Sequence, residues 1–169
     1  PTPVKFEPML RLSTESDATF APYTNICPIT GSSSEVLTIN GDDITIALGR
    51  TVYGGTLDVT SGVLVVDRAS VDLGSLPWTY VNIGNKYFYS VIDNMKYASP
   101  NGVCSCYNRN TTYGEASTVL NNGDFNTIIY HNYIYVRDDR YTDATQFNTA
   151  VTGQQLVYEL ATPNTYQLT

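Results

Sequence analysis

The chain has 169 residues, of which 42% are hydrophobic and only 15% are charged, and this length suits one domain with a sizeable core. The net charge is −7, from nine Lys and Arg residues against sixteen Asp and Glu residues, and the basic residues form no cluster. Because nucleic acids and anionic membranes are bound by clustered cations, and because no apolar run approaches the roughly 18 residues of a membrane span, we expect no nucleic-acid partner and no membrane insertion.

Residues 1–33 differ from the rest of the chain, and we expect a connector with one edge strand. Residues 4–12 alternate in hydropathy like a strand, but Pro8 has no backbone donor and restricts such a strand to a sheet edge. A polar stretch and a Gly-Ser-Ser-Ser run at 31–34 follow. The main domain is therefore predicted to span residues 34–169.

The main domain opens with two predicted hairpins. Strands at 35–40 and 43–48 flank the turn signal Asn40-Gly41. In the second hairpin, apolar and polar residues alternate over 56–60, and Ser61-Gly62 supplies a turn in which glycine takes a positive φ. The β-branched run 63–66 then fits a return strand that is covered on both faces.

The rest of the chain also alternates between short strands and turns. Gly84-Asn85 and His131-Asn132 are predicted hairpin turns, 108–114 is a predicted loop, and 161–164 is a predicted turn between the last two strands. The strands are expected at 69–76, 78–83, 86–92, 103–107, 127–130, 133–137, 156–160 and 165–168.

One helix interrupts this pattern, over residues 143–151. Asp143 is the predicted N-cap, Gln146 completes a capping box, and Gly153 ends the helix. Phe147 lies on the apolar face, and a helix this short must pack against the sheets to be stable. The sequence thus predicts an all-β protein, an antiparallel β-sandwich of jelly-roll type with one short α-helix.

Three stretches, 52–64, 138–147 and 153–169, occur together in an order that resembles the C-terminal modules of tail and tail-fibre proteins from phages and prophages of gut Firmicutes. This resemblance implies a virion component located on the tail, outside the cell, which takes part in host attachment. It also implies a homo-oligomer, such as a trimer, with other tail proteins and a bacterial surface glycan as partners. Residues 6–23 are similar to the last strand of a carbohydrate-binding-type jelly roll, which implies the end of a preceding module.

The cysteines and paired carboxylates indicate no metal site or cofactor. Cys104 and Cys106 lie on one face of a predicted strand, poorly placed to bridge each other, and no fourth zinc ligand is evident for them and Cys27. We therefore expect buried free thiols. The pairs Asp42-Asp43 and Asp138-Asp139 could hold Ca²⁺, but their places beside turns favour local hydrogen bonding.

No catalytic constellation is evident either. Glu115 and Glu159 are the glutamates that a glycosidase would use, yet nothing in the sequence pairs them. His131 lies in a predicted turn and has no nucleophile elbow to serve. We expect a protein that is not an enzyme, with a glycan-degrading enzyme as the weakest alternative.

The aromatic residues are more informative. The chain has fourteen Tyr residues, and tyrosine suits sugar stacking and protein contacts alike, although it is also common in strands. The candidate ligand-binding residues are Trp78, Tyr80, Tyr107, Asn108, Arg109 and Tyr113. We hypothesise an adhesion module that binds a bacterial surface glycan; the alternative is a scaffold domain that packs against other tail subunits.

Overall fold

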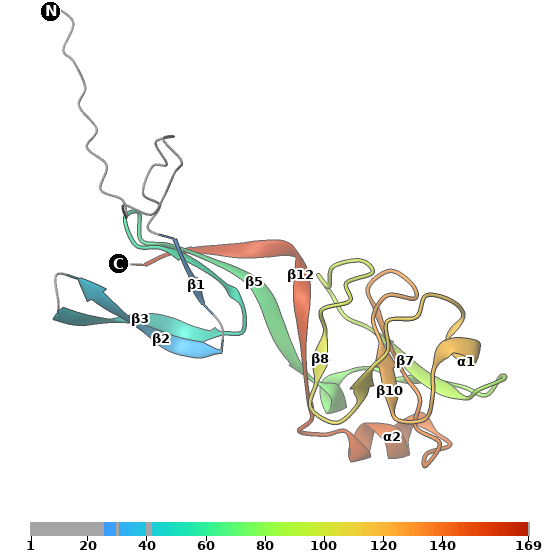
Figure 1. Ribbon diagram of the computed structural model, residues 1–169. Coiled ribbons are helices and arrows are strands. Elements are labelled where there is room, and N and C mark those ends of the chain that lie inside the picture. The colour runs from blue at the N-terminus through green and yellow to red at the C-terminus, as the bar shows by residue number, and fades with distance from the viewer. Residues whose placement is uncertain (1–25, 30, 40–41, 169) are drawn as a thin grey trace, which may run out of the picture.

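The computed structural model describes residues 26–29, 31–39 and 42–168, and the predicted edge strand at 4–12 and the Asn40-Gly41 turn lie outside these ranges. The described chain forms two five-stranded sheets and a separate hairpin (Figure 1). The predicted all-β, sandwich-like architecture with antiparallel sheets is confirmed, and among the described strands only β9 and β10 pair in parallel. No helix in these ranges is long and apolar enough to cross a membrane.

The elements divide between the sheets as follows. The first sheet has the order β1 (Ile26–Ile29), β4 (Gly55–Asp58), β5 (Val63–Asp72), β12 (Gln155–Gln167) and β8 (Val103–Cys104). The second has the order β6 (Thr79–Val81), β7 (Tyr87–Val91), β11 (Tyr133–Val136), β10 (Asp124–Asn126) and β9 (Asn108–Arg109). The hairpin consists of β2 (Ser32–Ile39) and β3 (Asp42–Val52), and the helical segments are η1 (Leu73–Ser75), α1 (Ala116–Val119) and α2 (Ala144–Ala150).

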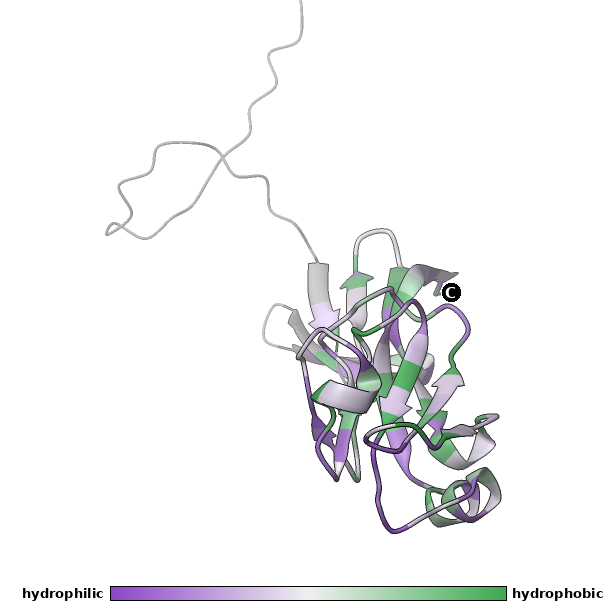
Figure 2. Ribbon diagram, turned by 90° about the vertical axis from the view of Figure 1, so that its right-hand side faces the viewer, coloured by the Kyte–Doolittle hydropathy of each residue, from purple (hydrophilic) through white to green (hydrophobic). Residues whose placement is uncertain are grey.

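Two long strands, β5 and β12, pair along almost their whole length and join two lobes (Figure 1). The small lobe holds β1 to β4, and its core residues are Ile29, Leu48, Val52, Leu57, Leu64 and Val66. The large lobe holds the second sheet and the helices around a separate, larger core. Figure 2 shows apolar and polar residues alternating along the strands, as expected for sheets with one buried face.

The predicted hairpin at 56–66 is confirmed as β4 and β5. Leu57 and Leu64 lie opposite each other and are buried, and Gly62 has a φ of +68° in the turn. The expectation that the return strand is covered on both faces is wrong. Val63 and Val65 are only half-buried, because the small lobe packs against one face of β5.

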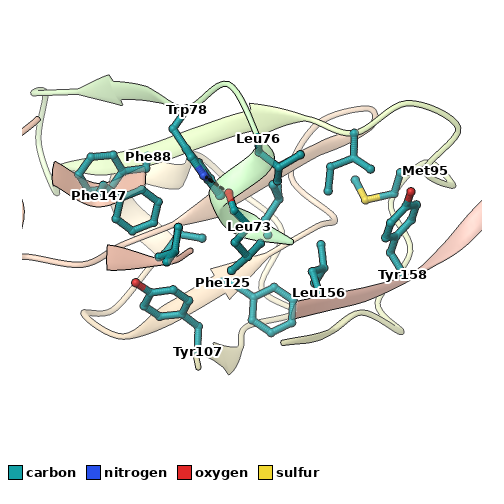
Figure 3. Packing of buried hydrophobic residues seen from close by; sticks show 14 of the residues in the cluster. Leu73, Leu76, Trp78, Phe88, Met95, Tyr107, Phe125, Phe147, Leu156 and Tyr158 are labelled. Carbon is teal, nitrogen blue, oxygen red and sulfur yellow. Dashed lines mark hydrogen bonds between the residues drawn. The ribbon is translucent and has the colours of Figure 1, made fainter. Parts of the chain in front are cut away.

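The core of the large lobe is organised around Phe147 of α2 (Figure 3). The Phe147 ring stacks on Phe88 of β7 at a centroid distance of 4.0 Å and meets the edge of Trp78 at 4.9 Å. The Trp78 indole Nε1 donates to the carbonyl of Leu73 at 2.7 Å, so the buried polar atom of this ring has its partner. These contacts hold α2 against η1 and the second sheet.

The helix begins as predicted. The Asp143 carboxylate accepts a hydrogen bond from the Gln146 backbone N–H at 2.9 Å, which satisfies one of the free donors of the first turn. Gly153 follows the helix with a φ of +82°, and its N–H donates to the carboxylate of Asp72 at the start of η1. The helix is therefore anchored at both ends.

Two predictions for the C-terminal half are wrong. The expected strands 156–160 and 165–168 form one strand, β12, with an irregularity between Glu159 and Asn164, because both halves pair with β5. At this kink, the Asn94 side chain both donates to and accepts from the backbone of Thr162, at 3.0 Å each. The segment 127–130 forms bends, not a strand, since β10 and β7 already occupy both sides of β11.

Candidate functional site

Trp78 and Tyr80 mainly contribute to the core. Trp78 is 7% exposed, and the visible part of its ring borders a shallow hollow of about 380 Å³ beside α2. Tyr80 of β6 is half-buried and packs against Phe88 at a centroid distance of 5.0 Å. Trp78 is therefore largely covered, and Tyr80 is partly covered.

The structure brings Tyr107, Asn108 and Arg109 together at the open side of the large lobe. They line a hollow of about 340 Å³ between β8 and β9, the edge strands of the two sheets. Asn108 and Arg109 are exposed, whereas Tyr107 is buried and only 9% exposed. Tyr113 is 73% exposed but does not line this hollow.

The Tyr107 hydroxyl belongs to a hydrogen-bond network around Asp138. It donates to Asp138 Oδ2 at 2.8 Å, and the Arg140 guanidinium donates to both carboxylate oxygens at 2.9 and 2.6 Å. Burial opposes ionisation of Asp138, but the hydrogen bonds from Arg140 and Tyr107 outweigh it and lower the pKa of this carboxyl. The network ties the loop after β11 to the floor of the hollow.

A larger aromatic surface lies on the outer face of the second sheet. We define the tyrosine face as Tyr87 and Tyr89 of β7, Tyr133 and Tyr135 of β11, and Tyr130 beside them. In β7 and β11 these tyrosines alternate with buried residues of the core, so the rings point away from the core. Tyr130 is 54% exposed, and the other four are partly exposed.

The rings of the tyrosine face form a continuous array. Tyr89 lies opposite Tyr135 in the antiparallel register, which brings their centroids to 6.1 Å. The diagonal pairs Tyr87–Tyr135 and Tyr89–Tyr133 are 5.9 and 5.6 Å apart, and Tyr130 lies 5.8 Å from Tyr133. These spacings are typical of aromatic pairs on neighbouring strands, so the five rings form one continuous aromatic surface.

His131 and Tyr97 extend this array at one end. The His131 ring lies 4.0 Å from Tyr130 and 5.4 Å from Tyr97. At the other end, the side-chain amide of Asn126 on β10 donates to the carbonyl of Thr112 at 3.0 Å, so the loop after β9 covers the sheet there. The exposed aromatic surface therefore coincides with β7, β11 and the turn before β11.

The phenol hydroxyls of this surface are polar groups available to a ligand. Within the described ranges, none of the five hydroxyls makes a hydrogen bond to another residue of the chain. Burial, followed by the neighbouring tyrosines, raises the pKa of Tyr135 to about 12, and burial also raises the pKa of Tyr87. Both hydroxyls therefore stay protonated at neutral pH and can donate as well as accept.

Of the two candidate catalytic glutamates, Glu159 has structural partners. The Glu159 carboxylate accepts hydrogen bonds from Ser99 and from the Asn101 side chain, the latter at 3.0 Å, and it lies 3.6 Å from the Lys96 ammonium. Glu115 is the exposed residue that precedes α1.

No cluster of three metal-ligating side chains occurs in the part of the chain that the structure describes. Asp138 and Asp139 instead pair with Arg140 and Arg137, and the side chain of Asp42 lies outside the described residues.

The tyrosine face was not singled out from the sequence, although part of its signal was there. Tyrosine occurs at every second position in two strands, at 87 and 89 and at 133 and 135, which places both pairs on one side of their strands. The missing information was that β7 and β11 are neighbours, because the sequence favoured a partner for β11 at 127–130.

Comparisons with known proteins add no relative: no protein-family model, no curated protein and no solved structure matches this chain. The chemistry of the site is therefore argued from its own geometry.

Proposed function

We propose that this protein is a non-enzymatic adhesion module of a phage tail or tail fibre, and that its tyrosine face binds neutral glycans on a bacterial surface. The observation that carries the proposal is the array of five partly exposed tyrosine rings on one sheet face, whose hydroxyls have no partner in the described chain. The phage assignment is supported by the resemblance of residues 52–64, 138–147 and 153–169 to tail modules.

Aromatic rings and hydroxyls are the groups that recognise a sugar ring. The apolar face of a pyranose packs on an aromatic plane, and its hydroxyls exchange hydrogen bonds with phenols that are amphipathic in the same way. Because the rings lie side by side on neighbouring strands, they can contact several sugar units of one chain. Several copies of the module would then combine weak contacts into firm attachment.

The charge of the protein favours a neutral ligand over an anionic one. The net charge is −7, and within the described residues the two close cation–ring contacts involve Tyr166 and Tyr141, which are not part of the tyrosine face. An anionic polymer such as teichoic acid would meet no clustered cations there, and long-range repulsion would oppose its approach.

The environment of Glu159 supports binding without hydrolysis. The acid of a glycosidase needs a raised pKa so that it carries a proton at neutral pH. The pKa of Glu159 is instead lowered, chiefly by the hydrogen bond from Ser99. Its carboxylate is thus suited to hold the loop at 99–101 and not to protonate a leaving group.

The test is binding of the protein to neutral cell-wall polysaccharides and to teichoic acid, each purified from a panel of Firmicutes strains. We expect affinity for a neutral polysaccharide that Tyr89→Ala lowers about tenfold, because one ring contact and one hydroxyl contact together contribute roughly 1–3 kcal/mol. Tyr53→Ala, in the small lobe, is the matched control and should bind like the wild type. Binding to teichoic acid alone, or equal binding by Tyr89→Ala, would refute the proposal.

A second function is favoured by the apolar residues on the same face. Val91 is 39% exposed and lies opposite Tyr133, and Val81 lies opposite Tyr87, so the face could instead pack against another tail subunit. Tyr89→Phe separates the two functions. Losing a hydroxyl should weaken glycan binding several-fold, whereas a packed protein interface keeps the ring and should tolerate the change.

A further inference from the structure

The two neighbouring cysteines of the large lobe lie in direct contact. The sulfur atoms of Cys104 and Cys106 are 3.8 Å apart, although the sequence predicted that they were poorly placed to bridge. The prediction assumed a strand through 103–107, but β8 ends at Cys104 and the chain bends over 105–107. Both cysteines are free thiols, as predicted, but the predicted burial is wrong for these two, since Cys104 is half-buried and Cys106 is exposed.

Ser105 holds the bend between the two thiols. Its backbone N–H donates to the carbonyl of Gln155 on β12 at 2.9 Å. Its hydroxyl donates to the Gln154 side chain at 2.8 Å and accepts from the Gln155 N–H at 2.9 Å. Three hydrogen bonds to one short segment fix the middle residue of Cys-Ser-Cys, so both sulfurs are kept on the same side of the bend.

We infer that Cys104 and Cys106 are a modification site, a dithiol that closes reversibly to an intramolecular disulfide when it meets a small-molecule disulfide such as oxidised glutathione. This inference is independent of glycan binding. One cysteine sulfur, as thiolate, attacks the small-molecule disulfide, which forms a mixed disulfide with the protein and releases one small-molecule thiol. The sulfur of the second cysteine then attacks this mixed disulfide, which forms the protein disulfide and releases the second small-molecule thiol. The protein loses two electrons and two protons, and the oxidant becomes two thiol molecules.

The surroundings favour this chemistry over metal binding. No third metal-ligating side chain accompanies the pair among the described residues, whereas closing a disulfide needs only the two sulfurs, which must approach from 3.8 Å to about 2.05 Å. The exposed Cys106 lies outside any strand, so it can make this movement without breaking the ladder between β8 and β12.

The pair can be reached from solvent, and its rate of exchange should depend on pH. Cys104 lines the same hollow as Tyr107 and Arg109, so a small disulfide can reach it from solvent. Although Cys106 as a residue is exposed, neighbouring atoms partly desolvate its sulfur, and this desolvation, followed by the adjacent Cys104 thiol, raises the pKa of Cys106 to about 12. Exchange should therefore be slow at neutral pH and faster in alkaline buffer, because the thiolate is the reactive species.

Mass spectrometry of one peptide tests the inference. Trypsin cleaves after Lys96 and Arg109, so the peptide 97–109 carries both cysteines, whereas Cys27 falls in the peptide 12–50. The full chain is equilibrated in glutathione buffers from fully reduced to fully oxidised, alkylated and digested. In oxidised buffer we expect most copies of the peptide 97–109 to lose the mass of two hydrogen atoms and to escape alkylation, and reduction should reverse this.

Two variants sharpen the result. Cys27→Ser should close the same disulfide, while Cys106→Ser should give only a glutathione adduct on Cys104. If the wild-type peptide 97–109 instead carries glutathione on one or both cysteines, joins another chain, or stays fully alkylated in oxidised buffer, the inference is overturned.

Discussion

The hydrogen bond between Tyr107 and Asp138 offers a quantitative test of the core of the large lobe. Asp138 is 4% exposed and Tyr107 is 9% exposed, and their 2.8 Å contact is the only hydrogen bond of the Tyr107 hydroxyl in the described chain. Asp138→Ala leaves that hydroxyl buried without an acceptor. A buried polar group without a partner costs about 1–3 kcal/mol.

We expect Asp138→Ala to lower the free energy of unfolding by about 2 kcal/mol. We count nothing for the Arg140 contact, because the Arg140 side chain is largely exposed and water screens its charge. For a chain of this size, 2 kcal/mol corresponds to a fall in Tm of roughly 4–8 °C. Tyr107→Phe should cost about 1–2 kcal/mol, since it removes one hydrogen bond to a carboxylate that keeps its other donors.

The assay is urea unfolding of the wild type, both single variants and the double variant. If the two side chains stabilise the fold through their mutual hydrogen bond, the loss of unfolding free energy in the double variant should be about 1 kcal/mol smaller than the sum of the losses in the two single variants. Tyr80→Phe is the matched control, since the Tyr80 hydroxyl has no hydrogen bond within the described residues, and we expect it to change stability by less than about 0.5 kcal/mol. Strictly additive single effects would refute the reasoning.

Three further outcomes are expected. Phe147→Ala should lower the free energy of unfolding in urea by about 3–5 kcal/mol, because it empties the centre of the large core; a loss below about 1 kcal/mol would mean that α2 does not pack as described. Asn94 has a φ of +56°, and its side chain makes two hydrogen bonds to the backbone of Thr162. Asn94→Gly can keep this backbone conformation but should lower the free energy of unfolding by about 1–2 kcal/mol and speed hydrogen exchange of the backbone amides at the kink of β12. Unchanged exchange there would contradict this. The pKa values of Asp138 and Glu159 are lowered by folding, so their contribution to stability is present above about pH 4 and is lost as pH falls through the lowered values. In urea unfolding from pH 6 to pH 3, Glu159→Gln should therefore reduce the decrease of the unfolding free energy with falling pH. An unchanged decrease would exclude Glu159 as a source of this pH dependence.

The sequence predicted those elements whose signals are local. The capping residues Asp143 and Gln146 are three positions apart and define the start of α2 without help from the fold. The turn at Gly62 depends on a glycine that tolerates a positive φ, and it is where the residue pattern placed it. In both cases the deciding atoms lie within a few residues of each other.

Other predictions failed where a choice of partner was involved. The proline and asparagine at 163–164 indicated a turn, but β5 is long enough to pair with both sides of this segment, so β12 continues through it. The Cys-Ser-Cys segment alternated like a strand, but hydrogen bonds from Ser105 to Gln154 and Gln155 bend it. Pairing with a distant segment overrode the local signal each time.

The sequence by itself determined that the chain forms short antiparallel strands with one capped helix, because hydropathy of period two, turn residues and helix caps act over a few bonds. Only the tertiary structure decided which residues share a surface. Tyr89 and Tyr135 meet because β7 and β11 are neighbours in one register, and a shift of one residue would send these rings into the core. The tyrosine face is thus a product of long-range strand pairing, which is chosen by the packing of both lobes together.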